Sequence, residues 1–193
     1  CKLDSILVGD SLGMVIKGDK TTLTVSLNEI KYHLQCVANN TSNTFVIVDM
    51  PFSTFHETPE KTFSHAAKLM ESGAQMVKLE GAEWLLKTIE FLTTRGIPVC
   101  SHLGMLPQSI HKIGHYRKFG SPDKENNALV KAATSLESAG SELLVLELVE
   151  PTTSKQITDN LNIPTIGIGS GKFVDGQVLV LYDILGLGRE LPF

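Results

Sequence analysis

The stretch Phe45-Val46-Ile47-Val48-Asp49 is a continuous apolar run that ends in a carboxylate. The same pattern occurs at Ile6-Leu7-Val8-Gly9-Asp10-Ser11, Met76-Val77-Lys78-Leu79-Glu80 and Leu143-Leu144-Val145-Leu146-Glu147. Runs of this kind are typical of parallel strands that are covered on both faces. Such a strand has no structural use for a carboxylate at its C-terminal end, so the four acids are candidates for a functional site.

Helical patterns lie between the apolar runs. The capping box Ser26-Leu27-Asn28-Glu29 predicts a helix start, and Thr58-Pro59-Glu60 predicts a second one with proline at the first helical position. Further helices are predicted at 83–95, 124–138 and 153–161. The strand candidates are 6–9, 45–48, 76–79, 97–100, 143–146, 165–168 and 178–182.

Strands that alternate with helices indicate an α/β fold. An open doubly wound sheet could use seven strands, whereas a (β/α)₈ TIM barrel needs eight and is usually nearer ~250 residues. In a barrel, the carboxyl ends of all strands converge on one mouth, and the even spacing of polar strand ends favours this fold. We therefore expect residues 1–193 to form a single barrel domain in which one strand and flanking helices are missing from the termini.

Bulk composition limits the classes of function. A chain of 193 residues with 42% hydrophobic and 20% charged residues is ordinary for a soluble globular domain. The net charge of -4 and the lack of a basic patch argue against a nucleic-acid partner, and no apolar stretch is long enough to cross a membrane. Three widely spaced cysteines, Cys1, Cys36 and Cys100, indicate reduced thiols, so we expect a cytoplasmic protein. Because the chain begins with cysteine almost directly before a strand, we expect its natural N-terminus to be missing.

Three of the strand-end acids suit a divalent cation. Asp10, Asp49 and Glu80 would supply hard oxygen ligands from three strands, which is the chemistry that Mg²⁺ prefers. Without a cation, three crowded carboxylates would repel one another and raise their pKa values. The structural alternative is that each acid caps the next helix or pairs with a lysine.

Other polar residues at the predicted mouth have candidate roles. Lys78 lies two residues before Glu80 and points to the same face of the strand, where it could donate to a substrate oxygen or form a buried ion pair. Ser11 and His102 are candidates for substrate contact. Glu147 is flanked by Leu146 and Leu148, and this apolar setting predicts a raised pKa suited to proton transfer.

Two motifs for other chemistries are rejected. The segment Gly167-Ile168-Gly169-Ser170-Gly171-Lys172 departs from the P-loop and from the Gly-x-Gly-x-x-Gly pattern, so we interpret it as a tight turn after a strand. No Gly-x-Ser-x-Gly nucleophile elbow occurs in the sequence.

The chain resembles the ketopantoate hydroxymethyltransferase family. The resemblance rests on an ordered set of motifs that runs nearly end to end. These motifs are Val8-Gly9-Asp10-Ser11-Leu12-Gly13-Met14, Asp49-Met50-Pro51-Phe52, Met76-Val77-Lys78-Leu79-Glu80-Gly81, His102-Leu103-Gly104, Pro107-Gln108-Ser109, Leu144-Val145-Leu146-Glu147, Ile166-Gly167-Ile168-Gly169 and Asp175-Gly176-Gln177. The chain departs from the family pattern beside these motifs, at Leu106, at His115 and at Glu150-Pro151.

The resemblance implies a barrel of the phosphoenolpyruvate/pyruvate type, and the strand and helices missing from this chain would be the first strand and the C-terminal helices of the family. It also implies a homo-oligomer, a decamer in the family. It implies transfer of a hydroxymethyl group from 5,10-methylenetetrahydrofolate to 3-methyl-2-oxobutanoate through a Mg²⁺-stabilised enolate, giving 2-dehydropantoate for pantothenate synthesis. The partners would be a 2-keto acid and a folate.

The same resemblance assigns roles to single residues. Asp10 and Asp49 match direct Mg²⁺ ligands, and Glu80 matches a third acid that acts partly through water. Ser11 and Lys78 match residues that bind the keto acid, together with the metal-binding Asp10 and Asp49. His102 matches an active-site histidine, and Glu147 matches the proton-transfer residue.

Two alternatives stay open at this point. One is a Mg²⁺-dependent lyase or mutase of the same barrel superfamily, although segment 101–107 lacks the catalytic cysteine loop of those enzymes. The other is a non-catalytic barrel that only binds an acid.

Overall fold

The fold is a curled, all-parallel sheet surrounded by helices, and the computed structural model describes residues 3–187. Seven strands pair in chain order, each with the next one along the sequence. The strands are β1 (Ser5–Val8), β2 (Phe45–Asp49), β3 (Met76–Glu80), β4 (Val99–Gly104), β5 (Leu143–Glu147), β6 (Thr165–Ile168) and β7 (Gly176–Gln177). Sequential parallel pairing is the topology of a (β/α) barrel and excludes the crossed strand order of a doubly wound sheet. The predicted fold class is therefore confirmed, with seven strands of the barrel present in the described residues.

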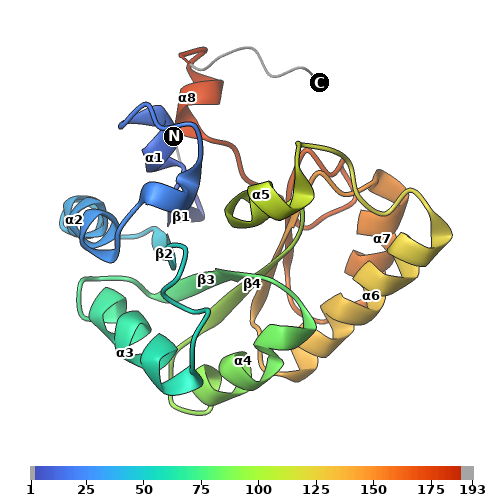
Figure 1. Ribbon diagram of the computed structural model, residues 1–193, viewed down its shortest axis with the longest axis horizontal. Coiled ribbons are helices and arrows are strands. Elements are labelled where there is room, and N and C mark those ends of the chain that lie inside the picture. The colour runs from blue at the N-terminus through green and yellow to red at the C-terminus, as the bar shows by residue number, and fades with distance from the viewer. Residues whose placement is uncertain (1–2, 188–193) are drawn as a thin grey trace.

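Helices follow the strands and cover the outside of the sheet (Figure 1). They are α1 (Leu12–Val15), α2 (Leu27–Ala38), α3 (Pro59–Met70), α4 (Leu86–Thr93), α5 (Ile110–Ile113), α6 (Asp123–Ser138), α7 (Pro151–Asn160) and α8 (Leu181–Ile184), with the 3₁₀ turns η1 (Thr22–Thr24), η2 (Glu83–Leu85) and η3 (Pro107–Ser109). None of the helices within residues 3–187 is long and apolar enough to cross a bilayer.

The predicted helix starts are confirmed in atomic detail. The hydroxyl of Ser26 accepts from the backbone N–H of Glu29, and the Glu29 carboxylate accepts from the backbone N–H of Ser26 at 2.7 Å. Thr58 caps α3 by accepting a hydrogen bond from the backbone N–H of Lys61, with Pro59 at the first helical position. The helix predicted at 83–95 begins instead as the 3₁₀ turn η2 and becomes α-helical at Leu86.

The strand predicted at 178–182 is wrong. The seventh strand is Gly176–Gln177, and the apolar residues after it lead into the short helix α8. Leu179 and Leu181 are 60% and 61% exposed, because among the described residues β7 pairs with β6 alone and offers them no second strand. Strand β4 is longer than predicted and extends through His102 to Gly104, because its pairing with β5 continues to Glu147.

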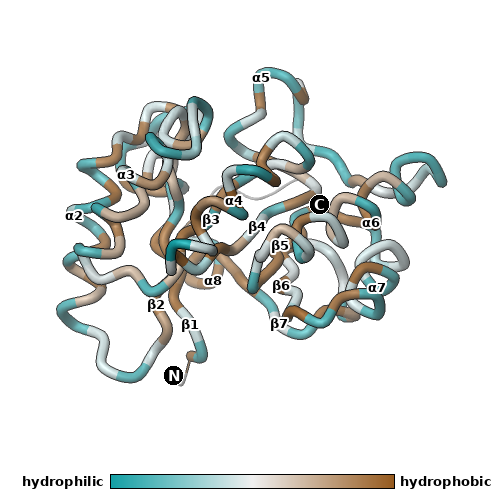
Figure 2. Tube along the Cα trace, turned by 90° about the horizontal axis from the view of Figure 1, so that it is seen from below, coloured by the Kyte–Doolittle hydropathy of each residue, from teal (hydrophilic) through white to brown (hydrophobic). Residues whose placement is uncertain are grey.

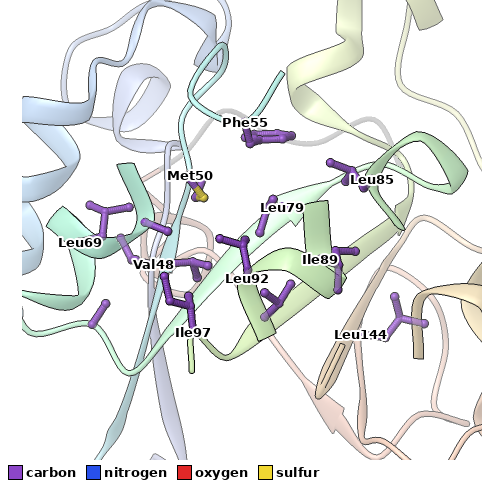
Figure 3. Packing of buried hydrophobic residues seen from close by; sticks show 14 of the residues in the cluster. Val48, Met50, Phe55, Leu69, Leu79, Leu85, Ile89, Leu92, Ile97 and Leu144 are labelled. Carbon is purple, nitrogen blue, oxygen red and sulfur yellow. The ribbon is translucent and has the colours of Figure 1, made fainter. Parts of the chain in front are cut away.

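The outer face of the sheet packs against the helices through aliphatic side chains. Figure 3 shows Leu79 of β3 facing Ile89 and Leu92 of α4, and all three are fully buried. Figure 2 shows the same separation along the chain, with hydrophobic segments on the strands and hydrophilic ones on the outer helices. This interface is continuous from α2 to α7 and forms the main hydrophobic core.

The inner face of the sheet carries two layers. A small apolar cluster forms its floor: Ile47, Met76, Cys100 and Val145. Two residues further along the same four strands, the same face carries polar side chains: Asp49, Lys78, His102 and Glu147. Because side chains alternate along a strand, the floor and the polar layer share one side of the sheet. Cys100 is fully buried in the floor, and burial raises the pKa of its thiol to about 12.

The capping box of α2 gives a stability prediction. The backbone N–H of Ser26 and the Lys17 ammonium lower the pKa of Glu29 to about 2. A carboxylate with a lowered folded-state pKa stabilises the fold above its ordinary value of 4.5, and this contribution disappears as the pH falls toward 2. Ser26→Ala should lower the free energy of unfolding by about 1 kcal/mol at pH 7, and by less at pH 3. Urea unfolding measures both values, with the exposed mid-helix variant Ser64→Ala as the control that should change little.

Candidate active site

The polar layer on the inner face brings together the strand-end residues that the sequence analysis singled out. Asp10 follows β1, Asp49 ends β2 and Glu80 ends β3. Their side chains are almost completely buried, at 4%, 4% and 5% exposure. The N-cap residues of the helical segments that follow these strands are Ser11, Thr58 and Ala82, so none of the three acids is used as a helix cap.

Asp10 and Asp49 are joined through the backbone. The N–H of Asp10 donates to Asp49 Oδ2 at 3.0 Å. A Cβ built on Gly9 would lie 3.2 Å from Ser11 Oγ and 3.3 Å from Asp49 Oδ2, which places the hydroxyl and the carboxylate around the same glycine. Ser11 is half-buried, and its hydroxyl lies beside the acids, as its place next to Asp10 in the sequence indicates.

Lys78 is the cation of this layer. Its Nζ lies 2.7 Å from Asp49 Oδ1 and 3.6 Å from Glu80 Oε1, and the side chain is 5% exposed. Burial opposes the charged form, but Asp49, Glu80 and Asp10 outweigh it and raise the pKa of Lys78. The buried ion pair expected as the structural alternative is therefore present. A charged donor held in this position remains able to meet a substrate oxygen.

His102 connects Glu80 with Glu147. Its Nδ1 lies 3.6 Å from Glu80 Oε1, and its Nε2 lies 3.4 Å from Glu147 Oε2. Burial and Lys78 oppose protonation of the ring, but Glu147 and Glu80 overcome them and raise the pKa of His102. Both contacts are longer than ordinary hydrogen bonds, and both ring nitrogens are buried without a hydrogen-bond partner in residues 3–187.

Glu147 lies at the more open end of the layer, with its side chain 15% exposed. The next residue, Leu148, has a left-handed backbone with φ of +49°, which is uncommon for a residue with a side chain. Its N–H donates to Ile168 O, and its O accepts from Phe119 N. These bonds hold the backbone that carries Glu147.

The segment at 167–172 is the predicted tight turn. Gly169 and Gly171 have positive φ, and the buried Ser170 hydroxyl donates to Leu146 O at 2.7 Å and accepts from Val149 N at 3.0 Å. The turn thus supports the backbone on both sides of Glu147.

The acids exceed the cations in this buried layer. Asp10, Asp49 and Glu80 face only one lysine. Burial, Asp49 and Glu80 raise the pKa of Asp10 well above its usual value, as predicted for crowded carboxylates. The pKa of Glu80 is instead lowered, because Lys78 and His102 overcome its burial. Asp10 is therefore the acid whose charge is least balanced by the chain, and a bound cation would balance it.

The donor set fits Mg²⁺. In the described part of the chain, no three His, Cys, Asp or Glu side chains are arranged to hold an ion by themselves. Mg²⁺ keeps several waters and usually takes one or two carboxylates together with ligand oxygens. A pair of acids from adjacent strands, with room for substrate and water, is the kind of site this ion uses.

Sequence reasoning gave Gln108 no role, although Pro107-Gln108-Ser109 was one of the family motifs. Its Nε2 donates to Asp10 Oδ2 at 2.8 Å, and its backbone N donates to Glu80 Oε2 at 3.0 Å. Tyr116 was also missed: it is 41% exposed, and its partial burial and the charges of Glu147, Glu80 and Asp10 raise its pKa to about 12. Both residues come from the segment after β4, which has no periodic pattern to identify it.

A cavity of about 730 Å³ lies away from these residues. It is lined by Asp4, Phe45 and Gln75, which lie at the amino ends of β1, β2 and β3. Active sites of such barrels lie at the carboxyl ends of the strands. This cavity therefore does not belong to the candidate active site.

The parallel (β/α) barrel and the buried acidic layer are together the features of a barrel enzyme. The active site of such an enzyme lies at the carboxyl ends of the strands. Residues 1–192 match the sequence model of the family described as ketopantoate hydroxymethyltransferase. The chain is 52% identical over 188 residues to the 3-methyl-2-oxobutanoate hydroxymethyltransferase of Idiomarina loihiensis, covering 97% of this chain and 70% of that protein. The chain therefore belongs to the ketopantoate hydroxymethyltransferase family.

Solved structures with low sequence identity show the same fold. A 2,3-dimethylmalate lyase, described as a member of the PEP mutase/isocitrate lyase superfamily, aligns with a TM-score of 0.67 at 14% identity, covering 95% of this chain and 70% of that one. A phosphonopyruvate hydrolase in complex with oxalate and Mg²⁺ aligns with a TM-score of 0.62 at 11% identity, covering 86% and 59%. The family match decides against both alternatives left open by the sequence, the lyase or mutase and the non-catalytic barrel.

The ion pair of Lys78 gives a second stability prediction. Lys78→Met should lower the free energy of unfolding by about 3–5 kcal/mol, because it leaves Asp49 buried without its cation and removes one of the two cations beside Glu80. The double variant Lys78→Met with Asp49→Asn removes one of the stranded charges and should be more stable than Lys78→Met alone. Urea unfolding of the three proteins without added divalent ions tests this, and equal stability of the single and double variants would contradict it.

The close approach of β4 and β5 gives a third prediction. Gly104 has φ of +93°, and a Cβ there would lie 2.2 Å from the backbone oxygen of Glu147. Gly96 has φ of +82° with nothing within 4 Å of its Cβ position. Backbone strain should cost both alanine variants about 1–2 kcal/mol. Gly104→Ala should lose more than this and should also lose activity, because its Cβ would in addition clash with the backbone that carries Glu147. Thermal unfolding and turnover of the two variants, side by side, measure the difference.

Proposed function

We propose that this chain catalyses hydroxymethyl transfer from 5,10-methylenetetrahydrofolate to 3-methyl-2-oxobutanoate, giving 2-dehydropantoate for pantothenate synthesis. The observation that carries this proposal is the unbroken row of ionisable side chains from Asp10 to Glu147 along the carboxyl ends of β1 to β5. At the Asp10 end of the row, the excess of negative charge suits a cation. At the Glu147 end, a partly exposed carboxylate is placed to accept a proton.

In this mechanism, Asp10 and Asp49 would hold Mg²⁺, and Glu80 would contribute through water. The ion, when bound, supplies Lewis-acid polarisation of the 2-keto group. A solved fold neighbour that holds oxalate and Mg²⁺ gives this assignment some support, since oxalate has the same pair of adjacent oxygens as a 2-keto acid.

The chain's own residues then orient the keto acid and move its proton. Lys78 donates to the substrate oxygen on which negative charge develops, which stabilises the transition state. Ser11 donates to the substrate carboxylate. Glu147 accepts the proton from C3, and the neighbouring His102 orients the Glu147 carboxylate. C3 is then able to form its new carbon–carbon bond with the methylene carbon of the folate. Both carbon–nitrogen bonds of that methylene break, water supplies the hydroxyl group, and tetrahydrofolate leaves.

Three further properties belong to the same proposal: the folate as co-substrate, a homo-oligomer such as the decamer of the family, and a cytoplasmic location. The family assignment supports the small-molecule keto acid and folate as the partners. The oligomer and the location remain predictions.

Proton exchange separates the first half of the reaction from folate chemistry. In ²H₂O with Mg²⁺ and no folate, the wild type should exchange the C3 proton of 3-methyl-2-oxobutanoate, as followed by NMR. Glu147→Gln should slow this exchange by about 10²–10⁴-fold, because it removes the base while keeping the size of the side chain. Asp49→Asn should lose the Mg²⁺ dependence of the exchange.

The matched control is Glu142→Gln, an exposed glutamate that precedes the same strand at its amino end. It should exchange at the wild-type rate. Wild-type exchange by Glu147→Gln would overturn the role given to Glu147, and Mg²⁺-independent exchange by the wild type would overturn the metal assignment.

A further inference from the structure

Gln108 connects three strand ends through its buried side chain and its backbone N–H. It lies in η3, is 5% exposed and is the second residue after Leu106, where the chain turns back over the inner face. Its Nε2 donates to Asp10 Oδ2 at 2.8 Å and to Met50 O at 2.9 Å. Its backbone N donates to Glu80 Oε2 at 3.0 Å. One residue thus contacts the segments that follow β1, β2 and β3.

The orientation of the Gln108 amide follows from these partners. Asp10 Oδ2 and Met50 O are both acceptors, so the NH₂ group must face them. The opposite orientation would place the amide oxygen against a carboxylate and a carbonyl. Both N–H groups of the amide are therefore used in these hydrogen bonds, and Oε1 must point away from Asp10 Oδ2 and Met50 O.

The amide oxygen has no partner of its own. Gln108 Oε1 is buried and accepts no hydrogen bond from any residue between 3 and 187. Buried acceptors in native proteins are normally satisfied, by protein or by an ordered ligand or water. An unsatisfied oxygen beside two carboxylates is suited to a donor that arrives with the ligand, such as water held by a cation.

We propose that Gln108 is a positioning residue for the divalent ion: its amide holds the Asp10 carboxylate in place for the ion, and its Oε1 accepts a hydrogen bond from water bound to that ion. This inference rests on the proposed function, because the ion is the one assigned there to Asp10 and Asp49. The role explains why the turn after β4 is tied both to an acid of the site and to the backbone after Asp49.

The figures agree with this placement of the turn. Helix α5, which directly follows η3, lies between α1 and α6 in Figure 1. The hydrogen bonds of Gln108 to Asp10 and Glu80 place the turn that carries it against the inner face that bears the acids.

The test measures ion binding without substrate. Mn²⁺ serves as the probe, and its dissociation constant is measured by EPR of the free ion with the wild type and with Gln108→Met, which keeps the size of the side chain. We expect Gln108→Met to bind Mn²⁺ about 10–100-fold more weakly, as is usual when a hydrogen-bond partner of a metal ligand is removed. In the exchange assay, its half-saturating Mg²⁺ concentration should rise by a similar factor, with a much smaller change in rate at saturating Mg²⁺.

Gln75→Met is the matched control. Gln75 also connects neighbouring strand segments, accepting from the backbone N of Val46 at 2.9 Å, but at the amino end of β2. Its loss should lower stability and leave Mn²⁺ affinity unchanged. If Gln108→Met does not fold, Gln108→Asn provides the second variant. Its amide is one methylene too short to reach Asp10 and Met50 together, and we expect it to bind Mn²⁺ about 3–10-fold more weakly, a smaller effect than the 10–100-fold typical when such a partner is lost altogether.

The outcomes separate this inference from the function on which it rests. Wild-type Mn²⁺ affinity in folded Gln108→Met or Gln108→Asn would overturn the role of Gln108 and leave the metal site intact. Failure of the wild type to bind Mn²⁺ would overturn the metal assignment in the proposed function, and this inference with it.

Discussion

The ion pair between Lys78 and Asp49 is the interaction on which the rest of the site depends. Taking either charge out of water alone is strongly unfavourable, so each is buried only because the other is 2.7 Å away. The pair leaves the acids in excess, since the charge of Lys78 also acts on Glu80 and Asp10. This excess arises from the fold as a whole, and it makes the inner face suited to a positive charge.

Strand alternation explains how a stable core and a charged site occupy the same sheet. In β3, Val77 and Leu79 face the helices, while Met76, Lys78 and Glu80 face inward. The inner face changes from apolar to charged within a single two-residue step. The apolar floor beneath excludes water from below, so the charges interact in a region of low polarity. Gly104 completes the arrangement, because the missing side chain lets β4 approach the backbone of Glu147.

Much of this could be predicted from the sequence, because the strands and the acids follow local rules. Continuous apolar runs identified six of the seven strands, and an acid at the end of a run is placed by the strand itself. The seventh strand was misplaced because Val178, Leu179 and Val180 are as apolar as any core strand, although within residues 3–187 the backbone pairing with β6 ends at Val178, which donates to Gly167 O. Gln108 could not be placed in the same way. It contacts Asp10 across a separation of 98 residues, from a turn without periodicity, so only the three-dimensional fold brings the two together.

The burial of Cys100 gives the molecule a chemical reporter of its own opening. Its thiol lies in the apolar floor directly beneath the charged layer, whereas Cys36 is exposed on α2. Alkylating reagents need a thiolate that they can reach, so Cys36 should be modified in the native state and Cys100 only when the inner face separates. The rate at which Cys100 is modified would then report the rate at which the sheet opens and uncovers the floor of the candidate active site.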